Sequence, residues 1–410
     1  MTPRQITIVG ASLAGLRAAE TLRTQGFDGV LTLIGDEPYP PYDRPPLSKQ
    51  VLRGDWEPER SFLRSKEGYD QLALDMRLGV KATSLDLRTN RVMLAGGTFA
   101  SYDRLIIATG ARVRSLPAVT PRAGVFTLRS LADAIALREA VRDATHVVIV
   151  GAGFIGLEVA ASCRARGLPV TVVEALPVPL APILGPKLGN MVAALHRDHG
   201  VDLRTGVTVA DVLGDSRVAG VVLSDESHID ADVVVVGIGV TPNTQWLECS
   251  GLTLDNGVVC DSFGEAAPGV YAAGDVARVA NEWYNGSPRI EHWTNAVEQA
   301  VHAATNLLTN QPARTRFSSV PYFWSDQYDR KFQFVGRAGP HDKMVVVDGS
   351  VDDRQLTALY RCGDQFAACL TVNQPRALAA YRRLLAAGAS WDTALSSASG
   401  VPSAGQPHGN

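Results

Sequence analysis

Two glycine-rich turns in the sequence have the residue types and the spacing to bind the phosphates of a dinucleotide. The clearer turn has Gly151, Gly153 and Gly156 in the order G-x-G-x-x-G, after an apolar run and before an amphipathic segment. The first glycine permits a tight turn, the second lets a pyrophosphate approach the backbone, and the third allows close helix–strand packing. The following helix would offer its free N–H groups and positive dipole end to the phosphates.

The acidic residue after this turn indicates which dinucleotide is bound. Glu174 ends the next apolar run, where its carboxylate can accept hydrogen bonds from both ribose hydroxyls and would repel a 2′-phosphate. No Arg or Lys occurs at 175–181. We therefore expect NAD rather than NADP at this site.

The first turn departs from the same pattern at one position. It reads Gly10-Ala-Ser12-Leu-Ala-Gly15, with a serine where the middle glycine belongs, and Asp36 or Glu37 follows it in place to hold a ribose. Serine is small and keeps its backbone N–H, so a pyrophosphate is still expected to fit. Two such turns predict two dinucleotides, one of which can be a flavin, but the residues alone do not say which turn holds which.

The segments around both turns predict the same strand–turn–helix–strand unit. The first copy has apolar runs at 6–9 and 30–34 around a helix at 13–25, whose apolar residues recur at helical spacing. The second has strands at 147–150 and 170–173 around a helix at 154–166. Further strands are expected at 102–108, 233–237 and 270–273. The predicted fold class is α/β, with two Rossmann-type dinucleotide-binding domains.

The chain changes character after about residue 316 and predicts a small α+β domain there. Short β-rich segments are separated by turns, and a helix is expected at 375–387. The expected strands include 333–335, 344–347, 356–360 and 366–372. The tail, 397–410, is rich in Ser, Gly, Pro and Ala and is expected to be disordered.

The composition limits the function classes. A chain of 410 residues is too long for one hydrophobic core, and its balance of 46% hydrophobic and 20% charged residues is ordinary for a globular protein. A net charge of −3 gives no sign of a nucleic-acid partner. There is neither an apolar run long enough to span a membrane nor a signal-peptide pattern at the start, so a cytoplasmic protein is expected.

The cysteines argue against a metal centre and against a dithiol. None of the five is paired with another at C-x-x-C spacing, and we expect most of them to be small buried apolar residues. The cysteines are Cys163, Cys249, Cys260, Cys362 and Cys369.

Several motifs resemble the NADH-dependent, FAD-containing ferredoxin reductases of bacterial oxygenase systems, the putidaredoxin, rhodocoxin and biphenyl dioxygenase reductase type. The most specific are the run Pro41-Tyr-Asp-Arg-Pro-Pro-Leu-Ser-Lys49 and the run Phe323-Trp-Ser-Asp-Gln327. The resemblance covers about residues 6–387. Other matches, shared with wider relatives, are Ala108-Thr-Gly110, Gly237-Ile-Gly239, Pro242-Asn243 and Val270-Tyr-Ala-Ala-Gly-Asp275.

The resemblance implies a glutathione-reductase-like arrangement of three domains. The FAD-binding domain would comprise 1–111 and 244–317, the NAD-binding domain 112–243, and the carboxy-terminal interface domain 318–396. FAD would then occupy the first turn. The residues that the turns and the resemblance assign to FAD are Gly10, Ser12, Leu13, Ala14, Gly15, Asp36, Glu37, Arg44, Lys49, Ala82, Ala108, Thr109, Gly110, Arg129, Gly274, Asp275, Trp293 and Trp324. Those assigned to NAD are Gly151, Gly153, Phe154, Ile155, Gly156, Glu158, Glu174, Gly237, Ile238 and Gly239.

The resemblance also implies roles for individual residues. Lys49 and Glu158 would form an ion pair near flavin N5, and Trp324 would cover a face of the flavin; these three are the expected catalytic residues. Asp275 would bind the ribityl or phosphate groups and could also cap a helix beginning at Val276. Trp293 would lie beside the flavin ring.

The implied activity is hydride transfer from NADH to FAD, followed by transfer of single electrons to a small iron–sulfur ferredoxin that feeds a haem monooxygenase or a Rieske dioxygenase. Neither nucleic acid nor membrane is an expected partner, and the chain is expected to be a monomer or a weak homodimer. Basic residues that could steer an acidic ferredoxin are Arg64, Lys66, Arg330 and Lys331.

Three alternatives remain open. A flavin–thiol enzyme, such as a coenzyme A disulfide reductase, an NADH oxidase or a peroxidase, would need a cysteine on the segment beside the flavin, and 44–49 has none. A rubredoxin reductase would share the same machinery. A signalling protein resembling apoptosis-inducing factor would bind FAD and NADH but act through partners.

Overall fold

The computed structural model describes residues 3–116, 122–281, 286–339 and 342–398, and it forms two compact units. Unit 1 comprises 1–43, 59–112 and 240–321; unit 2 comprises 44–58, 113–239 and 322–410. The chain passes between them five times, and two of these passages fall at β8 (Ala111–Val113) and β17 (Val240–Pro242), which pair with each other.

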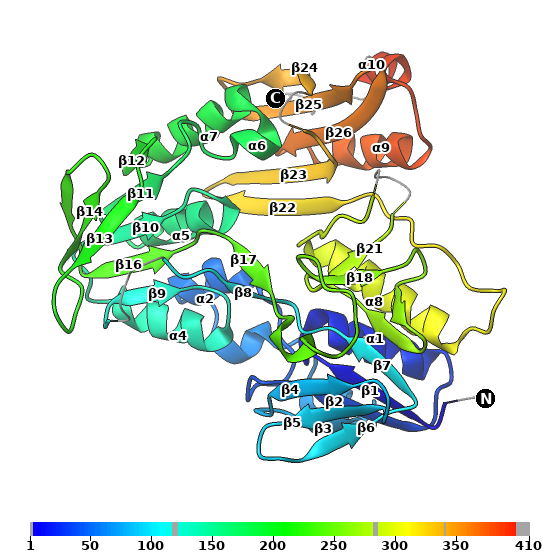
Figure 1. Ribbon diagram of the computed structural model, residues 1–410. Helices are drawn as coiled ribbons and strands as arrows, with labels where there is room; N and C mark the ends of the chain where they lie inside the picture. The colour runs from blue at the N-terminus through cyan, green and yellow to red at the C-terminus, as the bar shows by residue number, and fades with distance from the viewer. Residues whose placement is uncertain (1–2, 117–121, 282–285, 340–341, 399–410) are drawn as a thin grey trace. The chain divides into compact units, whose positions relative to one another are not determined.

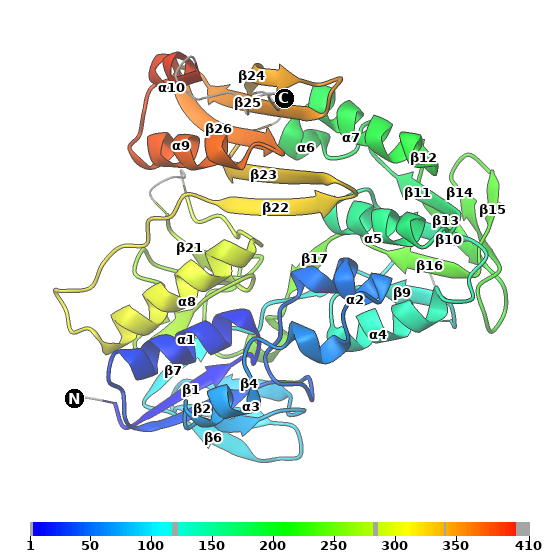
Figure 2. The ribbon, with the colours of Figure 1, turned by 180° about the vertical axis from the view of Figure 1, so that it is seen from behind.

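Unit 1 is built on a mostly parallel six-stranded sheet. Its order is β19 (Glu265–Ala267), β20 (Val270–Ala272), β7 (Arg104–Ile107), β1 (Gln5–Val9), β2 (Val30–Ile34) and β3 (Asp75–Arg77). Only β19 and β20 pair antiparallel. Helices α1 (Leu13–Thr24) and α8 (Trp293–Leu308) pack against each other and lie side by side in Figures 1 and 2. Because both faces of β1 are covered, four of its five residues are buried.

Smaller elements complete unit 1. The antiparallel strands β4 (Ala82–Asp86), β5 (Arg91–Leu94) and β6 (Phe99–Ser101) share a hydrophobic core with the main sheet. The other smaller elements are α3 (Lys66–Asp70), η3 (Gln245–Leu247) and the parallel pair β18 (Val258–Cys260) and β21 (Ala277–Val279).

Unit 2 contains a second parallel sheet of the same kind. Its five strands run in the order β12 (Val201–Thr205), β11 (Val170–Glu174), β10 (Val147–Val150), β16 (Val233–Val236) and β9 (Val125–Thr127). All neighbouring strands pair parallel. The helices of this part are α4 (Leu131–Ala140), α5 (Phe154–Ala165), α6 (Ala181–Leu184) and α7 (Pro186–Asp198), and a small antiparallel sheet comprises β13 (Val209–Leu213), β14 (Gly220–Leu223) and β15 (His228–Asp230).

The rest of unit 2 is an antiparallel sheet with two helices. The sheet runs in the order β22 (Tyr322–Gln327), β23 (Arg330–Gly336), β26 (Gln365–Val372), β25 (Gln355–Cys362) and β24 (Lys343–Ser350). Helix α9 (Pro375–Ala386) packs on β23 and β26, and α10 (Trp391–Ala398) follows it. The short segment 44–58, which contains the 3-10 helix η1 (Pro45–Ser48) and α2 (Gln50–Arg53), also belongs to this unit.

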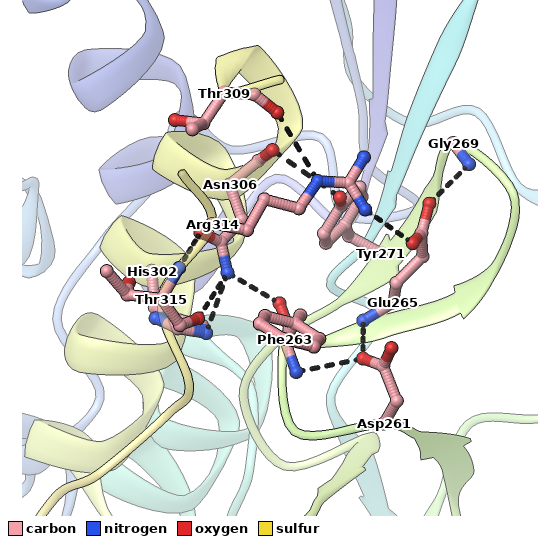
Figure 3. Close-up of polar contacts among 10 residues, drawn as sticks. All are labelled: Asp261, Phe263, Glu265, Gly269, Tyr271, His302, Asn306, Thr309, Arg314 and Thr315. Atoms are coloured by element: carbon pink, nitrogen blue, oxygen red, sulfur yellow. Dashed lines mark hydrogen bonds and ion pairs between the residues drawn. The ribbon is translucent and has the colours of Figure 1, made fainter. Parts of the chain in front are cut away.

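A buried polar cluster in unit 1 holds the chain that follows α8 (Figure 3). The side chain of Asn306, which is 1% exposed, donates to the carbonyls of Phe263 and Thr315 and accepts from the backbone N–H of Thr315. Arg314 forms an ion pair of 2.7 Å with Glu265. The segment between α8 and β22 forms no helix or strand, and these contacts hold it in place. The cluster therefore has a structural role.

The predicted strands and the predicted helices at 13–25, 154–166 and 375–387 are confirmed, with ends shifted by one to three residues or by a few more in the carboxy-terminal sheet. Many elements were not predicted, among them α4, α7, the small sheets β4–β6 and β13–β15, β22, which contains the Phe323–Gln327 motif, and α10. The expected disordered tail falls largely on 399–410, which lie outside the described residues. No helix in the described part of the chain has both the length and the apolarity needed to cross a membrane.

Candidate functional site

The two glycine-rich turns are built by the same set of contacts. The N–H of Gly10 donates to the Ile34 carbonyl at 2.7 Å, and the N–H of Gly151 donates to the Val173 carbonyl at 2.8 Å. A Cβ on Gly10 would lie 2.1 Å from the Ala108 oxygen. On Gly151 it would lie 2.5 Å from the equivalent oxygen, that of Gly237.

The last glycine of each turn is also required by the fold. A Cβ on Gly15 would lie 1.9 Å from the Gly10 oxygen, and a Cβ on Gly156 would lie 2.2 Å from the Gly151 oxygen. Non-bonded heavy atoms do not lie this close, so these helices can approach their strands only because the glycines have no side chain. Four of the glycines in the two turns are therefore explained by the protein alone.

The middle position of each turn is different. A Cβ on Gly153 would meet nothing within 4 Å, so nothing in the protein explains a glycine there. Gly153 is the N-cap of α5, and Ser12 holds the same place as the N-cap of α1. The Ser12 side chain makes no capping hydrogen bond. Gly153 thus borders open space at a helix N-terminus, which fits a bound phosphate, and a small half-buried serine stands at the equivalent place of the first turn.

The acidic residues after the two turns are not equivalent. Glu174 accepts from the N–H of Ala152 at 2.7 Å and from the N–H of Leu176 at 2.8 Å, which fixes its carboxylate beside the turn. Because Val173 and Ile34 hold equivalent hydrogen bonds, the first-turn counterpart of Glu174 is Gly35, one residue before Asp36.

Asp36 and Glu37, the two residues expected to hold a ribose, have different surroundings. Asp36 is exposed, whereas Glu37 accepts a hydrogen bond from the Tyr42 hydroxyl at 2.5 Å. Asp36 is thus the freer of the two to accept from a ligand.

The loops at the ends of β7 and β16 lie beside the turns. Ala108 donates to the Val9 carbonyl at 2.7 Å, as Gly237 does to Val150 at 2.8 Å. The side chains of Thr109 and Asn243 each bond the other's backbone, which ties the segment 108–110 to the returning chain. The second loop, 237–239, is fixed where Arg114 N–H donates to the Gly239 oxygen at 3.0 Å.

The other FAD-assigned residues of unit 1 occupy distinct elements. Ala82 begins β4, and the Gly274 N–H donates to the buried Gln299 side chain. Trp293 begins α8 and its indole donates to Asp43 at 2.7 Å. The expectation that Asp275 caps a helix is wrong: the chain turns at Val276 and enters strand β21, because β21 pairs with β18 there.

Unit 2 holds four of the FAD-assigned residues, Arg44, Lys49, Arg129 and Trp324. Arg44 donates to the Arg129 carbonyl, next to the capping box of α4. Trp324 is half-buried on β22. In the helix at the second turn, the Phe154 ring packs against Phe323 with 4.9 Å between centroids.

Ile155, in the first turn of α5, is 49% exposed. A large exposed apolar side chain at this place suits contact with a bound ligand.

Lys49 and Glu158 form a buried ion pair in unit 2. The Lys49 Nζ lies 2.7 Å from Glu158 Oε2, and the two side chains are 8% and 6% exposed. Ser48 donates to the same carboxylate oxygen at 2.6 Å, and Ser325 donates to Oε1 at 2.8 Å. Three donors around one carboxylate stabilise its charge away from water.

The two serines were missed as site residues, although both stand inside the quoted motifs. Ser48 precedes Lys49 in one, and Ser325 follows Trp324 in the other. The sequence shows that these residues belong to the motifs, but only the structure shows that both contact Glu158.

The cysteines do not form a reactive centre in the described part of the chain. Cys163, Cys260 and Cys369 are buried, and burial raises the pKa of the Cys163 and Cys260 thiols to about 12. Cys249 and Cys362 are exposed. The described residues also include no group of His, Cys, Asp and Glu that could hold a metal ion.

The basic residues expected to steer a ferredoxin are partly neutralised. Arg64 is ion-paired with Glu20, and Lys331 lies 3.0 Å from Asp326. Lys66 is exposed on α3. Arg330 lies 3.6 Å from Asp329, so three of the four carry an acidic partner.

Comparison with known proteins identifies the family. Residues 4–300 match the pyridine nucleotide-disulphide oxidoreductase model, and 322–401 match the reductase C-terminal model. Rhodocoxin reductase of Rhodococcus erythropolis is 40% identical over 93% of this chain and 89% of its own. Putidaredoxin reductase of Pseudomonas putida is 34% identical over 90% of this chain and 89% of its own.

Solved structures agree. The covalent complex of putidaredoxin reductase with putidaredoxin matches with a TM-score of 0.90 at 31% identity, over 98% of this chain and 99% of that one. The expected fold class is thereby confirmed. The chain belongs to the pyridine nucleotide-disulphide oxidoreductase family, within which it is of the FAD-containing ferredoxin reductase type.

Proposed function

We propose that this chain is an NADH:ferredoxin reductase that uses FAD and supplies electrons, through a small iron–sulfur ferredoxin, to an oxygenase. The observation that carries the proposal is the pair of closed glycine turns, each at the N-terminus of a helix, with an open middle position at Gly153 and, at the equivalent place, Ser12, which makes no capping hydrogen bond. The relatives' names, rhodocoxin reductase and putidaredoxin reductase, support the ferredoxin as acceptor.

The residues present fit both dinucleotides. The turn 10–15, with Asp36 after it, would hold the FAD pyrophosphate and ribose, and the turn 151–156, with Glu174, would hold NADH. Bound FAD supplies the hydride acceptor and releases electrons one at a time. The protein's part is to bind, orient and keep the reacting rings away from water.

NADH is preferred to NADPH because Glu174 is held in place by two backbone N–H groups. A fixed carboxylate accepts hydrogen bonds from ribose hydroxyls and repels a 2′-phosphate. The next positive charge along the chain is Lys187, well past the segment that follows β11.

Lys49 and Glu158 set the charge at the reacting end of the site, where the family resemblance assigns them. Trp324 would cover a face of the flavin ring, as the resemblance implies. The pair is neutral as a whole, so it can orient the reacting rings without placing an unpaired charge beside them. Hydride transfer requires donor and acceptor atoms at roughly 3–3.5 Å, so this positioning supplies much of the rate.

The chain works in the cytoplasm as a monomer or weak homodimer. Its described cysteines are all unpaired, as is usual where thiols stay reduced. Lys66, together with the ion-paired Arg64, Arg330 and Lys331, is a candidate docking residue for an acidic ferredoxin.

The test uses the purified holoprotein under anaerobic conditions. NADH should bleach the flavin absorbance rapidly, and an added oxygenase-type ferredoxin should be reduced in turnover. Alkylation of the exposed thiols, Cys249 and Cys362, should leave both rates unchanged. Loss of activity on alkylation, or turnover with peroxide or disulfide, would indicate a flavin–thiol enzyme; bleaching without fast ferredoxin reduction would indicate a binding protein.

A further inference from the structure

A line of buried polar side chains continues from the Lys49–Glu158 pair into unit 2. Ser325 accepts from the Gln327 side-chain amide at 3.1 Å, and the Gln327 oxygen lies 2.9 Å from His196 Nε2. The other ring nitrogen of His196, Nδ1, lies 3.2 Å from the Tyr328 hydroxyl. Ser325, Gln327 and His196 are each 0% exposed.

The direction of every bond in this line follows from the carboxylate at its end. An ionised carboxylate only accepts, so the single proton of the Ser325 hydroxyl points to Glu158. The Ser325 oxygen must then accept from the Gln327 NH₂, which turns the Gln327 oxygen towards His196. His196 therefore carries its proton on Nε2.

The far end of the line fits the same direction. With the proton on Nε2, Nδ1 of neutral His196 is an acceptor, and the Tyr328 hydroxyl donates to it. Burial lowers the pKa of His196 to about 4, so the ring is neutral at physiological pH. The titratable groups around the ring are His199, at the end of the same helix, and Tyr328; Arg164 of α5 acts on Tyr328.

The backbone conformation and the ring contact of Tyr328 fix its hydroxyl beside His196. Tyr328 is in the two-residue turn between β22 and β23 with φ +55°, a conformation that costs a non-glycine residue energy. Its ring stacks on His199 with 3.6 Å between centroids and 14° between planes. Asn or Gly would suit such a turn better, so the tyrosine is there for its ring and hydroxyl.

We propose that Ser325, Gln327, His196 and Tyr328 form a one-directional hydrogen-bond chain that keeps the Ser325 hydroxyl a donor to Glu158 and so positions Glu158 against Lys49. These are positioning residues: among the described residues they reach the ion pair only through Glu158. The inference rests on the proposed function for its effect on turnover. The hydrogen-bond chain fixes where the protons lie, and those proton positions can be tested without turnover.

If the chain ran the other way, Glu158 would lose a donor. A proton on Nδ1 of His196 would require Gln327 to turn its NH₂ towards Nε2 and its oxygen towards Ser325. The Ser325 hydroxyl would then donate to Gln327 instead of Glu158. The tautomer of one histidine thus reports the arrangement at the ion pair.

The first experiment is ¹⁵N NMR of the holoprotein labelled at histidine. The His196 signals, assigned from their loss in His196→Asn, should show the neutral Nε2–H tautomer from pH 5.5 to 8. Tyr328→Phe should shift the Nδ1 signal while leaving the tautomer unchanged. An Nδ1–H tautomer, or titration of His196 near pH 6.5, would overturn the proposal whether or not the enzyme turns over.

The second experiment measures flavin reduction by NADH in Ser325→Ala and Gln327→Met. A hydrogen bond to a charged group contributes about 1.5–3 kcal/mol, so the limiting rate in Ser325→Ala should fall at least about tenfold. NADH affinity should change less than about twofold, and Ser325→Thr, which keeps the hydroxyl, should recover most of the rate. Gln327→Met, which removes only the anchor of Ser325, should give a smaller fall.

Thr371→Val is the matched control. Thr371 is a buried hydroxyl in the same sheet as Ser325, with no hydrogen-bond partner for its Oγ1 among the described residues. Its substitution should leave the limiting rate unchanged. Equal rates in Ser325→Ala and the wild type, with only a lower unfolding temperature, would reduce the chain to a structural role. If substituting Lys49 or Glu158 also had no effect on the rate, the proposed function of the ion pair would fail, and the NMR result would stand separately.

Discussion

The sharpest test of the NADH site is Gly153→Ala. The fold does not require this glycine, because a Cβ there would meet nothing within 4 Å and the backbone has φ −73° and ψ 174°. Alanine is a poorer N-cap than glycine by about 0.5 kcal/mol, but it restricts the unfolded chain by about 0.4–1 kcal/mol. The free energy of unfolding should therefore stay within about 0.5 kcal/mol of the wild type.

Binding should respond quite differently. The added methyl group stands in the open space at the N-terminus of α5, where the pyrophosphate is expected to approach the backbone. Losing one charge-assisted hydrogen bond of about 1.5–3 kcal/mol raises the dissociation constant for NADH about 10- to 100-fold. FAD content should not change, because the substitution lies in the other turn.

The assay pairs calorimetric titration of the holoprotein with NADH and urea unfolding of the same samples. Gly156→Ala is the contrasting variant: its Cβ would lie 2.2 Å from the Gly151 oxygen, so it should lose stability as well as binding. Wild-type NADH affinity in Gly153→Ala would refute the reasoning, since it would leave the middle glycine without a ligand to explain it.

Four further outcomes are expected. Glu174→Gln, which keeps both backbone hydrogen bonds but removes the charge, should lower the preference of kcat/KM for NADH over NADPH about tenfold; an unchanged ratio would mean that the charge does not select the coenzyme. Lys49→Met should cost about 3–5 kcal/mol in urea unfolding by leaving a buried carboxylate unpaired, and adding Glu158→Gln should recover at least half of that; additive losses would show that the two residues do not interact. The low pKa of His196 means that the unfolded chain binds a proton between about pH 6.5 and 4 while the folded one does not, so stability should fall by about 2 kcal/mol between pH 7.5 and pH 5, and His196→Gln should remove that part of the slope. Asn306→Ala should cost about 2–3 kcal/mol by orphaning three backbone groups, measured by thermal unfolding; a change under 0.5 kcal/mol would show that the cluster in Figure 3 does not stabilise the fold.

The sequence predicted the elements that build both turns because their signals are local. Four- and five-residue apolar runs, glycines at fixed spacing and helices of about twelve residues need no information from elsewhere in the chain. Helix α10 was missed although Ser390 caps it through the N–H of Thr393, because the low-complexity composition of the tail masked that short signal.

The residues around Glu158 could not be predicted in the same way. Ser48 and Ser325 are 277 positions apart in the chain, and both meet a carboxylate carried by α5. The motifs showed that these serines belong to the family pattern, whereas burial and hydrogen-bond direction gave them a role. The segment 44–58 likewise groups with unit 2 through the bonds of Ser48 and Leu52 to α5 and the residue after it, which no local pattern reveals.

The comparison of the two turns separates what a glycine pattern says about folding from what it says about binding. Gly10, Gly15, Gly151 and Gly156 would be required in an empty protein, since each lets backbone approach backbone. The middle position is the one where we expect the ligand, and not the fold, to select the residue. One turn has Gly153 there, and the other has Ser12, whose hydroxyl does not cap its helix. A serine hydroxyl in that place can itself donate to a phosphate, so its presence is compatible with a dinucleotide and does not weaken the first site. If Ser12→Gly left FAD affinity unchanged while Ser12→Val abolished it, space alone would matter at this position; a loss in Ser12→Gly would instead identify the hydroxyl as a donor to FAD.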